Sequence, residues 1–293
     1  MPQITTCASL GYSHYPLEEA ARRIAARGIR QIEITHLAFY SLHYVLAEVD
    51  AANVKAMLAR FGLTATAMNF NTGWLDSTGF PQLQRLDDPD QAQQFETIMA
   101  RLLADARQLG VRVVTVPILR RRTGATEREQ RREVEHGAII IGRLADVAAG
   151  MGLRLALEAP HVRLLYYDLA RLSELLSLVT TDSLGVVLDS SHWRVVGYDL
   201  DEYFALVGKR LCHVHLRDAA AAGDGVAHDL EMTPGRGQVD FRLLGQKLDA
   251  IKYHGQVSLE FEYRDVPLDA IEAEYDAGIA HLKACGWAVP PGI

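Results

Sequence analysis

The sequence predicts a single α/β domain, a (β/α)₈ TIM barrel that comprises residues 1–293. Three observations support this fold class. Short apolar runs alternate with amphipathic helical stretches eight times along the chain, which is the pattern of parallel strands joined by helical crossovers. The length suits one barrel, because barrels of eight such units typically have about 250 residues. The composition does not change abruptly at any point, so no domain boundary is expected.

The eight apolar runs are the predicted strands. They are short, rich in β-branched residues and bounded by turn residues, as expected for strands that are buried on both faces. In chain order they cover residues 4–9, 31–35, 64–69, 112–117, 154–158, 185–189, 211–216 and 256–261. The first of them is not followed by a GxGxxG motif, which disfavours an open, dinucleotide-binding sheet. A closed barrel is therefore the favoured architecture.

Helical stretches lie between the predicted strands. The clearest have apolar residues at helical spacing and cover residues 17–26, 47–60, 92–109 and 143–149. Each is followed closely by a glycine, and glycine is common just beyond the last residue of a helix. These glycines are Gly28, Gly62, Gly110 and Gly152. The repeated order of helix, glycine and strand predicts that neighbouring strands run parallel.

Composition and charge exclude several classes of protein. Apolar residues make up 49% of the chain and charged residues 23%, ordinary values for a soluble globular protein. The net charge of −7 opposes binding to polyphosphate, so nucleic acid is not an expected partner. Cys7, Cys212 and Cys285 are too far apart for a CxxC pair or a disulfide framework, which suits a reducing cytosol. No leader-like or membrane-spanning apolar run is present, so a cytoplasmic protein without a membrane partner is expected.

Two connections are unusually long. Residues 70–87 follow the third predicted strand, and residues 218–240 follow the seventh. In a barrel, both would lie at the face formed by the carboxyl ends of the strands, where active sites of this architecture are built. The alternative is that both are insertions without a functional role.

A potential metal ligand ends each of four consecutive predicted strands. Each follows an apolar run, and alternation along the strand directs it into the barrel together with the residue two positions before it. The four sequence contexts are LALEAPH, GVVLDSSHW, CHVHLRD and VSLEFEY. The four predicted ligands are Glu158, Asp189, His215 and Glu260.

Three carboxylates and one imidazole at this place predict a divalent cation. Left alone, they would repel one another and remain desolvated inside the barrel. Hard oxygen ligands with one nitrogen, and positions open to water or substrate, favour Mn²⁺, Mg²⁺ or Co²⁺ over a structural zinc. The alternative is that a local arginine or backbone group satisfies each carboxylate separately. That explanation suits one residue better than four at equivalent places.

The chain resembles the xylose isomerase-like barrel superfamily, in particular the sugar phosphate isomerase/epimerase branch that includes ketose 3-epimerases. No single motif is specific, but their order and spacing together indicate this superfamily, without indicating a particular substrate. The matching segments are Leu157–Glu158, Asp189–His192, His213–Asp218, Pro234–Asp240 and Leu259–Glu260. The resemblance implies a barrel with one divalent ion, Mn²⁺ being the first expectation, held by the four predicted ligands.

The resemblance also implies roles for individual residues. In the epimerase branch the two glutamates act as an acid/base pair, so Glu158 and Glu260 are the predicted catalytic residues. His192 and Arg217 match positions that contact substrate oxygens. The implied substrate is a small polyhydroxy carbonyl compound, and the implied assembly is a homodimer or homotetramer. Arg217 lies nearer to the histidine ligand than the arginine of ketose 3-epimerases does, which disfavours free ketohexoses as substrates.

Such a site supports more than one reaction. Removal of a proton beside a carbonyl gives an enediolate, whose charge a metal stabilises. Return of the proton to the opposite face gives epimerisation, its return to the neighbouring carbon gives isomerisation, and loss of a β-hydroxyl gives dehydration. A metal-dependent dehydratase of an inosose or a dehydroshikimate-like acid therefore remains an alternative to an isomerase or epimerase.

Two alternatives belong to other classes. A nuclease like endonuclease IV would need further histidines on the third and fourth strands, which here end in Asn69 and Pro117. A non-catalytic sugar-binding subunit would keep the same ligands without proton exchange. No glycine loop that would cradle a phosphate is evident after the eighth strand.

Several neighbouring residues leave their roles open. Glu262 shares a face with Glu260 and competes with it as a ligand. His213 is expected to pack one layer below His215, and Arg217 could pair with Asp218. Arg236 could meet a substrate anion. His36, Asn69 and His161 follow or end predicted strands and could line the pocket.

Overall fold

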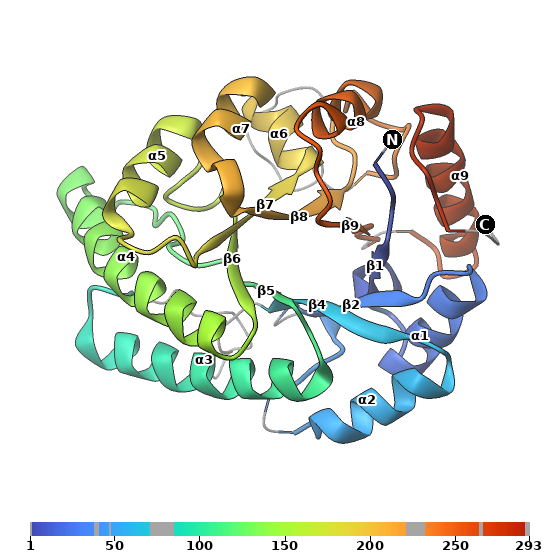
Figure 1. The fold of residues 1–293 in the computed structure, drawn as a ribbon, viewed down its shortest axis with the longest axis horizontal. Coiled ribbons are helices and arrows are strands. Elements are labelled where there is room, and N and C mark those ends of the chain that lie inside the picture. The colour runs from blue at the N-terminus through green and yellow to red at the C-terminus, as the bar shows by residue number, and fades with distance from the viewer. Residues whose placement is uncertain are drawn as a thin grey trace.

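The structure, a computed structural model, is a closed barrel of parallel strands surrounded by helices (Figure 1). It describes residues 2–37, 41–46, 48–70, 85–220, 232–263 and 266–290. The middle of each of the two long connections predicted at 70–87 and 218–240 lies outside these ranges. Among the helices in these ranges, none is both long and apolar enough to span a membrane.

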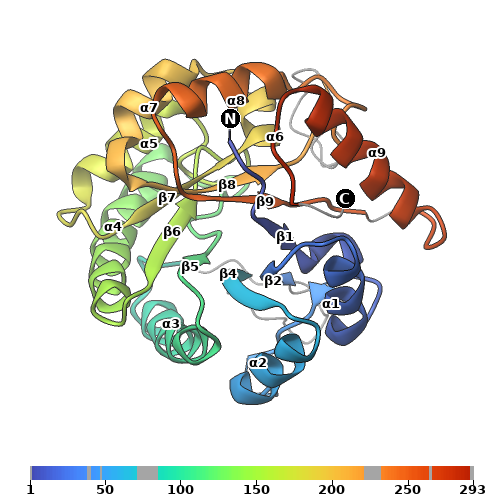
Figure 2. The ribbon, with the colours of Figure 1, turned by 45° about the vertical axis from the view of Figure 1, so that its right-hand side comes forward.

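Eight parallel strands form the barrel wall. They are β1 (Thr6–Ala8), β2 (Gln31–Leu37), β4 (Thr64–Phe70), β5 (Val113–Thr115), β6 (Arg154–Glu158), β7 (Gly185–Asp189), β8 (Leu211–Leu216) and β9 (Gln256–Leu259). The wall closes because β1 pairs in parallel with both β2 and β9 (Figure 2). A short strand, β3 (Ser41–Leu42), pairs antiparallel with the end of β2. The predicted fold class and the eight predicted strands are confirmed.

The helices cover the outside of the wall. They are α1 (Leu17–Ala26), α2 (Ala51–Arg60), α3 (Pro89–Leu109), α4 (Glu127–Gly150), α5 (Leu169–Leu178), α6 (Ser190–Val196), α7 (Leu200–Val207), α8 (Phe241–Ala250) and α9 (Ile271–Ala284). Two short 3₁₀ turns, Ser9–Tyr12 and Gly208–Arg210, precede α1 and β8.

The structure corrects the start of three predicted helices. The expected start of α4 at residue 143 is wrong, because a capping box of Thr126 and Glu129 starts the helix at Glu127. The first half of α4 consists mostly of charged residues, so the spacing of apolar residues does not reveal this part of the helix. The Asp50 side chain accepts a hydrogen bond from the Asn53 N–H and starts α2 at residue 51 rather than 47. The Asp88 cap starts α3 at residue 89 rather than 92.

Some strands are shorter than predicted. β5 ends at Thr115 rather than Pro117, since proline has no N–H to donate to a strand ladder. β9 ends at Leu259, so Glu260 follows the strand instead of ending it. The Glu260 N–H still donates to the Leu216 carbonyl oxygen at 3.2 Å, which holds the start of the next segment against β8.

A small apolar layer fills the barrel below the site. Ala67, Val113, Ala156 and Val187 form a cluster that is separate from the main core, with the partly buried Cys212 packed against it. Ala156 and Val187 lie two positions before Glu158 and Asp189, so alternation places these carboxylates on the same inner face. The wall is tight at Gly185, where an added Cβ would lie 2.6 Å from the Cys212 sulfur. The apolar layer therefore forms the floor of the polar site.

Candidate metal centre

The four predicted ligands meet inside the carboxyl ends of the strands. Glu158, Asp189, His215 and Glu260 each offer one ligand atom, and these atoms lie within 4.8 Å of one another. The parallel register explains the convergence, because Asp189 pairs with His215 and Leu216 pairs with Leu259. The four side chains are nearly inaccessible to solvent, with Glu158 the most exposed at 6%. Their role as metal ligands remains a prediction.

His215 is bound on both sides of its ring. Its Nδ1 lies 2.7 Å from Glu158 Oε1 and 3.1 Å from Glu260 Oε2, and its Nε2 lies 3.1 Å from Glu33 Oε1. Burial alone would lower the pKa of this imidazole. The carboxylates of Glu260, Glu33 and Glu158 outweigh burial and raise the pKa well above its usual value. The surrounding carboxylates therefore favour the charged form of this imidazole.

The carboxylates differ in charge state. Burial, assisted by the nearby charges of Glu260 and Asp189, raises the pKa of Glu158 to about 7. Burial also works to raise the pKa of Asp189, but the charge of Arg217 and the contributions of His192 and His215 outweigh it. The pKa of Asp189 consequently lies well below its usual range. The cluster thus contains one carboxyl poised near neutrality beside one that stays ionised.

Glu260 has an oxygen that a cation would satisfy. Its Oε1 accepts a hydrogen bond from Asn69 Nδ2 at 3.0 Å. Its Oε2 is buried and has no hydrogen-bond partner among the described residues, although His215 Nδ1 lies 3.1 Å away in a poor direction. An unpartnered buried carboxylate oxygen is costly. Together with the neighbouring oxygens and one imidazole, it fits the donor set of a divalent ion.

Asp189 has two structural roles besides facing the cluster. Its Oδ1 accepts hydrogen bonds from the N–H groups of Ser191 and His192, at 2.6 and 3.2 Å, and caps the start of α6. Its Oδ2 accepts from Arg217 at 2.6 Å. The sharp change from β7 to α6 is therefore built on the same side chain that the sequence predicts as a ligand.

Arg217 lies beside the ligands and is itself held by carboxylates. Its guanidinium donates to Asp189 Oδ2 at 2.6 Å, to Glu262 Oε2 at 2.5 Å and to Ser191 Oγ at 3.2 Å. Glu262 therefore pairs with Arg217, while Glu260 lies in the ligand cluster. The alternative pairing with Asp218 does not occur, because Asp218 instead accepts hydrogen bonds from four N–H groups. They belong to Ala219, Gly235, Gly237 and Val239.

His192 faces the same cluster with an uncommitted ring. Its Nε2 lies 3.8 Å from Glu158 Oε2, and neither ring nitrogen has a hydrogen-bond partner in the part of the chain that the structure describes. The side chain is 2% exposed, and burial lowers its pKa to about 4. A buried polar group without a partner suits contact with a ligand. Substrate contact by His192 remains a prediction.

His161 stacks against His192 and points at the same carboxylate. The ring centroids are 3.9 Å apart, and His161 Nε2 lies 3.6 Å from Glu158 Oε2. His161 Nδ1 accepts a hydrogen bond from the Arg163 N–H at 3.1 Å, so a neutral ring carries its proton on Nε2. Glu158, His161 and His192 also form a compact group, but this tautomer leaves His161 Nε2 without a lone pair for a metal. His161 is better suited to donate to a substrate oxygen.

Glu33 is a site residue that the sequence analysis missed. It lies on β2 and is fully buried. Its two carboxylate oxygens each form a 3.1 Å hydrogen bond, one with Nε2 of His213 and the other with Nε2 of His215. His213 therefore forms a hydrogen bond with Glu33 and is not one of the four residues of the ligand cluster, as expected. The available signal was alternation along QIEITHL, which places Glu33 and Thr35 on one face.

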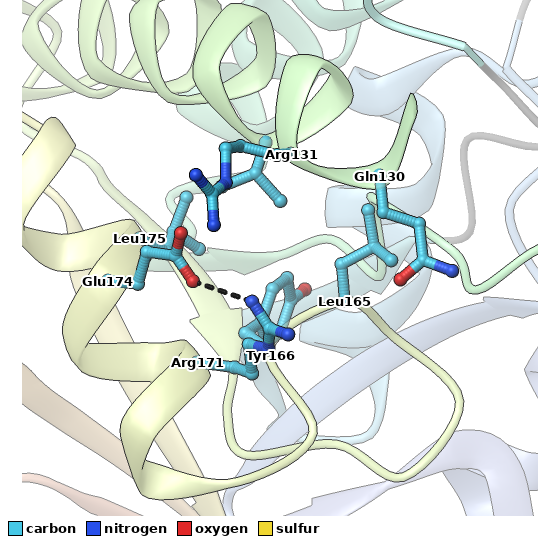
Figure 3. A pocket seen from close by; sticks show the side chains of 8 residues that line it. Gln130, Arg131, Leu165, Tyr166, Arg171, Glu174 and Leu175 are labelled. Atoms are coloured by element: carbon cyan, nitrogen blue, oxygen red, sulfur yellow. Dashed lines mark hydrogen bonds and ion pairs between the residues drawn. The ribbon is translucent and has the colours of Figure 1, made fainter. Parts of the chain in front are cut away.

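Other features lie outside the cluster. His36 stacks on Phe70, with ring centroids 4.6 Å apart. Arg236 forms an ion pair with Glu274, so its charge is already balanced without a substrate anion. A small pocket between α4 and α5 contains an ion pair of Arg171 and Glu174 at 2.9 Å (Figure 3). None of the four predicted ligands lines this pocket.

Comparison with known proteins points to one family. The sequence profile of the family described as xylose isomerase-like TIM barrel matches residues 21–285. An inosose isomerase of Bacillus subtilis (strain 168) is 26% identical over 162 residues, which are 54% of this chain and 57% of the relative. The match thus covers little more than half of the relative's length.

Solved structures show the same fold at low identity. D-psicose 3-epimerase from Clostridium cellulolyticum H10, with D-tagatose, superposes with a TM-score of 0.72 at 17% identity, covering 97% of this chain and 99% of that chain. The IOLI protein with a binding zinc atom gives a TM-score of 0.72 at 19% identity, covering 95% of this chain and 98% of that chain. These similarities support the barrel architecture.

Proposed function

The chain belongs to the xylose isomerase-like TIM barrel family, and from this premise we propose that it is a divalent-metal-dependent isomerase or epimerase. The proposed substrate is a small sugar or keto-polyol. The name of the inosose isomerase relative and that of the D-psicose 3-epimerase neighbour support this substrate class. The zinc atom in the IOLI structure supports metal dependence.

The observation that carries the proposal is the buried cluster of Glu158, Asp189, His215 and Glu260. These residues would hold one divalent ion, with Mn²⁺ as the first choice and Mg²⁺ or Co²⁺ as alternatives. When bound, the ion would polarise the substrate carbonyl and stabilise the negative charge that develops on its oxygen. Asp189 would stay ionised at neutral pH, because the charge of Arg217 holds its pKa well below the usual range.

Glu158 and Glu260 are the proposed acid/base pair. They come from β6 and from the residue after β9, with β7 and β8 between them, so they approach the barrel interior from separated parts of the wall. One carboxylate would accept a proton from the carbon beside the carbonyl, and the other would return a proton to the opposite face or to the neighbouring carbon. The hydrogen bond from Asn69 would fix the orientation of Glu260.

Three further residues would orient the substrate. Nε2–H of His161 and the unpartnered ring of His192 lie on the Glu158 side of the cluster, where they would bind hydroxyl or carbonyl oxygens. Arg217 would contribute a remaining N–H or hold Asp189 in place. A neutral histidine pair suits uncharged polyol groups better than it suits a second cation.

The test is proton exchange with solvent. Protein loaded separately with Mn²⁺, Mg²⁺ and Co²⁺ is incubated in D₂O with ketoses, inososes and dehydroshikimate, and the products are followed by NMR. The proposal expects metal-dependent deuterium incorporation beside the carbonyl, together with an epimer or isomer. Loss of a β-hydroxyl would instead establish the dehydratase alternative, and absence of exchange with every compound would favour a non-catalytic sugar-binding protein.

A further inference from the structure

We propose that Glu33 is a positioning residue of the metal centre, which fixes the His215 ring so that Nδ1 is the ligand atom. The inference rests on the proposed metal centre and assigns to it a carboxylate that does not touch the ion. Glu33 lies on β2 and His215 on β8, and β1 and β9 separate these strands in the wall. Their contact therefore crosses the barrel interior.

The hydrogen bonds determine which nitrogen is available. A carboxylate only accepts hydrogen bonds, so the 3.1 Å contact between Glu33 Oε1 and His215 Nε2 requires the proton on Nε2. Nδ1 also lies against carboxylates, so a metal ion that binds here would displace the proton on Nδ1, and the neutral ring that remains has its lone pair on Nδ1. That atom is the one that lies 2.7 Å from Glu158 Oε1 and 3.1 Å from Glu260 Oε2. The lone pair therefore points among the other predicted ligands.

The charge of Glu33 adds to this geometric effect. A carboxylate that accepts the second N–H of a metal-bound imidazole makes the ring a stronger ligand, and loss of such a partner typically lowers metal affinity about 10- to 100-fold. Glu33 is fully buried, so water does not screen its interaction with His215. No direct contact with the ion is needed for the effect.

His213 fixes Glu33 in turn. Its Nε2 lies 3.1 Å from Glu33 Oε2, and its Nδ1 has no hydrogen-bond partner in the described ranges. The two imidazole rings meet edge to face with centroids 4.8 Å apart. One carboxylate thus bonds to two imidazoles through separate oxygens, which prevents rotation of the side chain. Because His213 Nδ1 is uncommitted, His213 can change tautomer without losing another bond.

The main test compares Glu33→Gln with Glu133→Gln. Glutamine at 33 can direct its oxygen to His215 and its amide group to His213, so the tautomer and the fold are retained while the charge is lost. Glu133 is a matched control: it is 1% exposed and lies on α4, where it pairs with Arg122 at 3.2 Å. Co²⁺ binding is measured by calorimetry and by the visible spectrum of the bound ion.

The three possible outcomes are distinct. We expect Glu33→Gln to bind Co²⁺ about 10- to 100-fold more weakly and with a changed spectrum, while Glu133→Gln binds it as the unmodified protein does. Equal affinity and an unchanged spectrum for Glu33→Gln would overturn the role of Glu33 and leave the proposed metal centre intact. Failure of the unmodified protein to bind Co²⁺ would instead overturn the metal centre itself.

A second measurement needs no variant and applies even if Glu33→Gln does not fold. The unmodified protein is labelled with ¹⁵N-histidine, loaded with Zn²⁺ and studied by NMR. The expected result is a His215 ring protonated at Nε2 and bound to the metal through Nδ1. Binding through Nε2, or an unprotonated Nε2, would overturn the proposal.

Discussion

The two halves of the barrel wall end in different chemistry. The strands β2, β4 and β5 carry Thr35, Asn69 and Thr115 near their carboxyl ends, all uncharged. The strands β6 to β9 carry or precede the four predicted ligands. The first half contributes hydrogen bonds, such as the one from Asn69 to Glu260, and the second contributes charge. Confining the charges to one side lets them offset one another, which limits the cost of burying them.

Glu33 is an exception to this division between an uncharged half and a charged half. It is a charged residue of the first half, but it lies one layer deeper than Thr35 and acts on His215 of the second half. If the proposed site is correct, the halves differ in which groups contact the substrate, while both halves contribute residues to the site. Substitutions in the second half should abolish chemistry, and substitutions in the first half should weaken it.

The largest effect is expected for Glu158→Gln, in the charged half. Loss of one member of an acid/base pair typically lowers the rate about 10²- to 10⁴-fold. The variant should fold, because glutamine keeps the shape of the side chain. Deuterium incorporation into substrate, followed by NMR in D₂O, measures the effect. Exchange at the rate of the unmodified protein would eliminate Glu158 as an acid or base.

The next largest effect is expected from removal of the metal, which should lower the stability of the fold mainly in the charged half. An ion present at 100 times its dissociation constant stabilises the fold by about 2.7 kcal/mol. Treatment with a chelator should therefore lower the melting temperature and increase hydrogen exchange in β6 to β8 more than in β2 and β4. Equal loss of protection in both halves would contradict the comparison.

Acid should destabilise the first half through His36. Burial lowers the pKa of His36 to about 4, whereas an unfolded histidine titrates near 6.5. Between these values the unfolded chain binds more protons, so stability falls as the pH falls. This residue should account for a loss of about 2 kcal/mol between pH 7.5 and 5.

The variant His36→Phe isolates this contribution, since phenylalanine can keep the stacking on Phe70. Denaturant unfolding at both pH values should show a smaller loss of stability for the variant than for the unmodified protein. An identical loss would show that His36 is not the group responsible.

The smallest effect is expected for Asn69→Ala, in the uncharged half. The variant loses the hydrogen bond to Glu260 Oε1, and a hydrogen bond to a charged group is worth about 1.5 kcal/mol or somewhat more. The turnover rate should fall roughly tenfold, while Co²⁺ still binds. A loss as large as that of Glu158→Gln would show that the first half takes a direct part in proton transfer.

Much of the fold could be predicted because its signals are local. The strands Arg154–Glu158 and Gly185–Asp189 and the helix Leu17–Ala26 have the predicted limits, since apolar runs and glycines mark their ends. The start of α4 could not be found from apolar spacing, because its first three turns are mostly charged. The capping box at Thr126 and Glu129 was the signal that mattered there.

The candidate site was predictable only in part. Alternation and strand order suffice to bring Glu158, Asp189, His215 and Glu260 together. The hydrogen bonds between side chains were not predictable, because each depends on how residues distant in sequence meet in space. Glu33 meets His215 in this way, and Arg217 pairs with Glu262 rather than with its neighbour Asp218.

The most direct test of the central claim is the position of a bound ion. Crystals grown with Mn²⁺ are measured at the manganese absorption edge, and the anomalous signal locates the metal without assumptions about its ligands. We predict one strong peak at bonding distance from Glu158, Asp189, Glu260 and His215 Nδ1. A peak at Glu158, His161 and His192 instead, or no peak inside the barrel, would contradict the account.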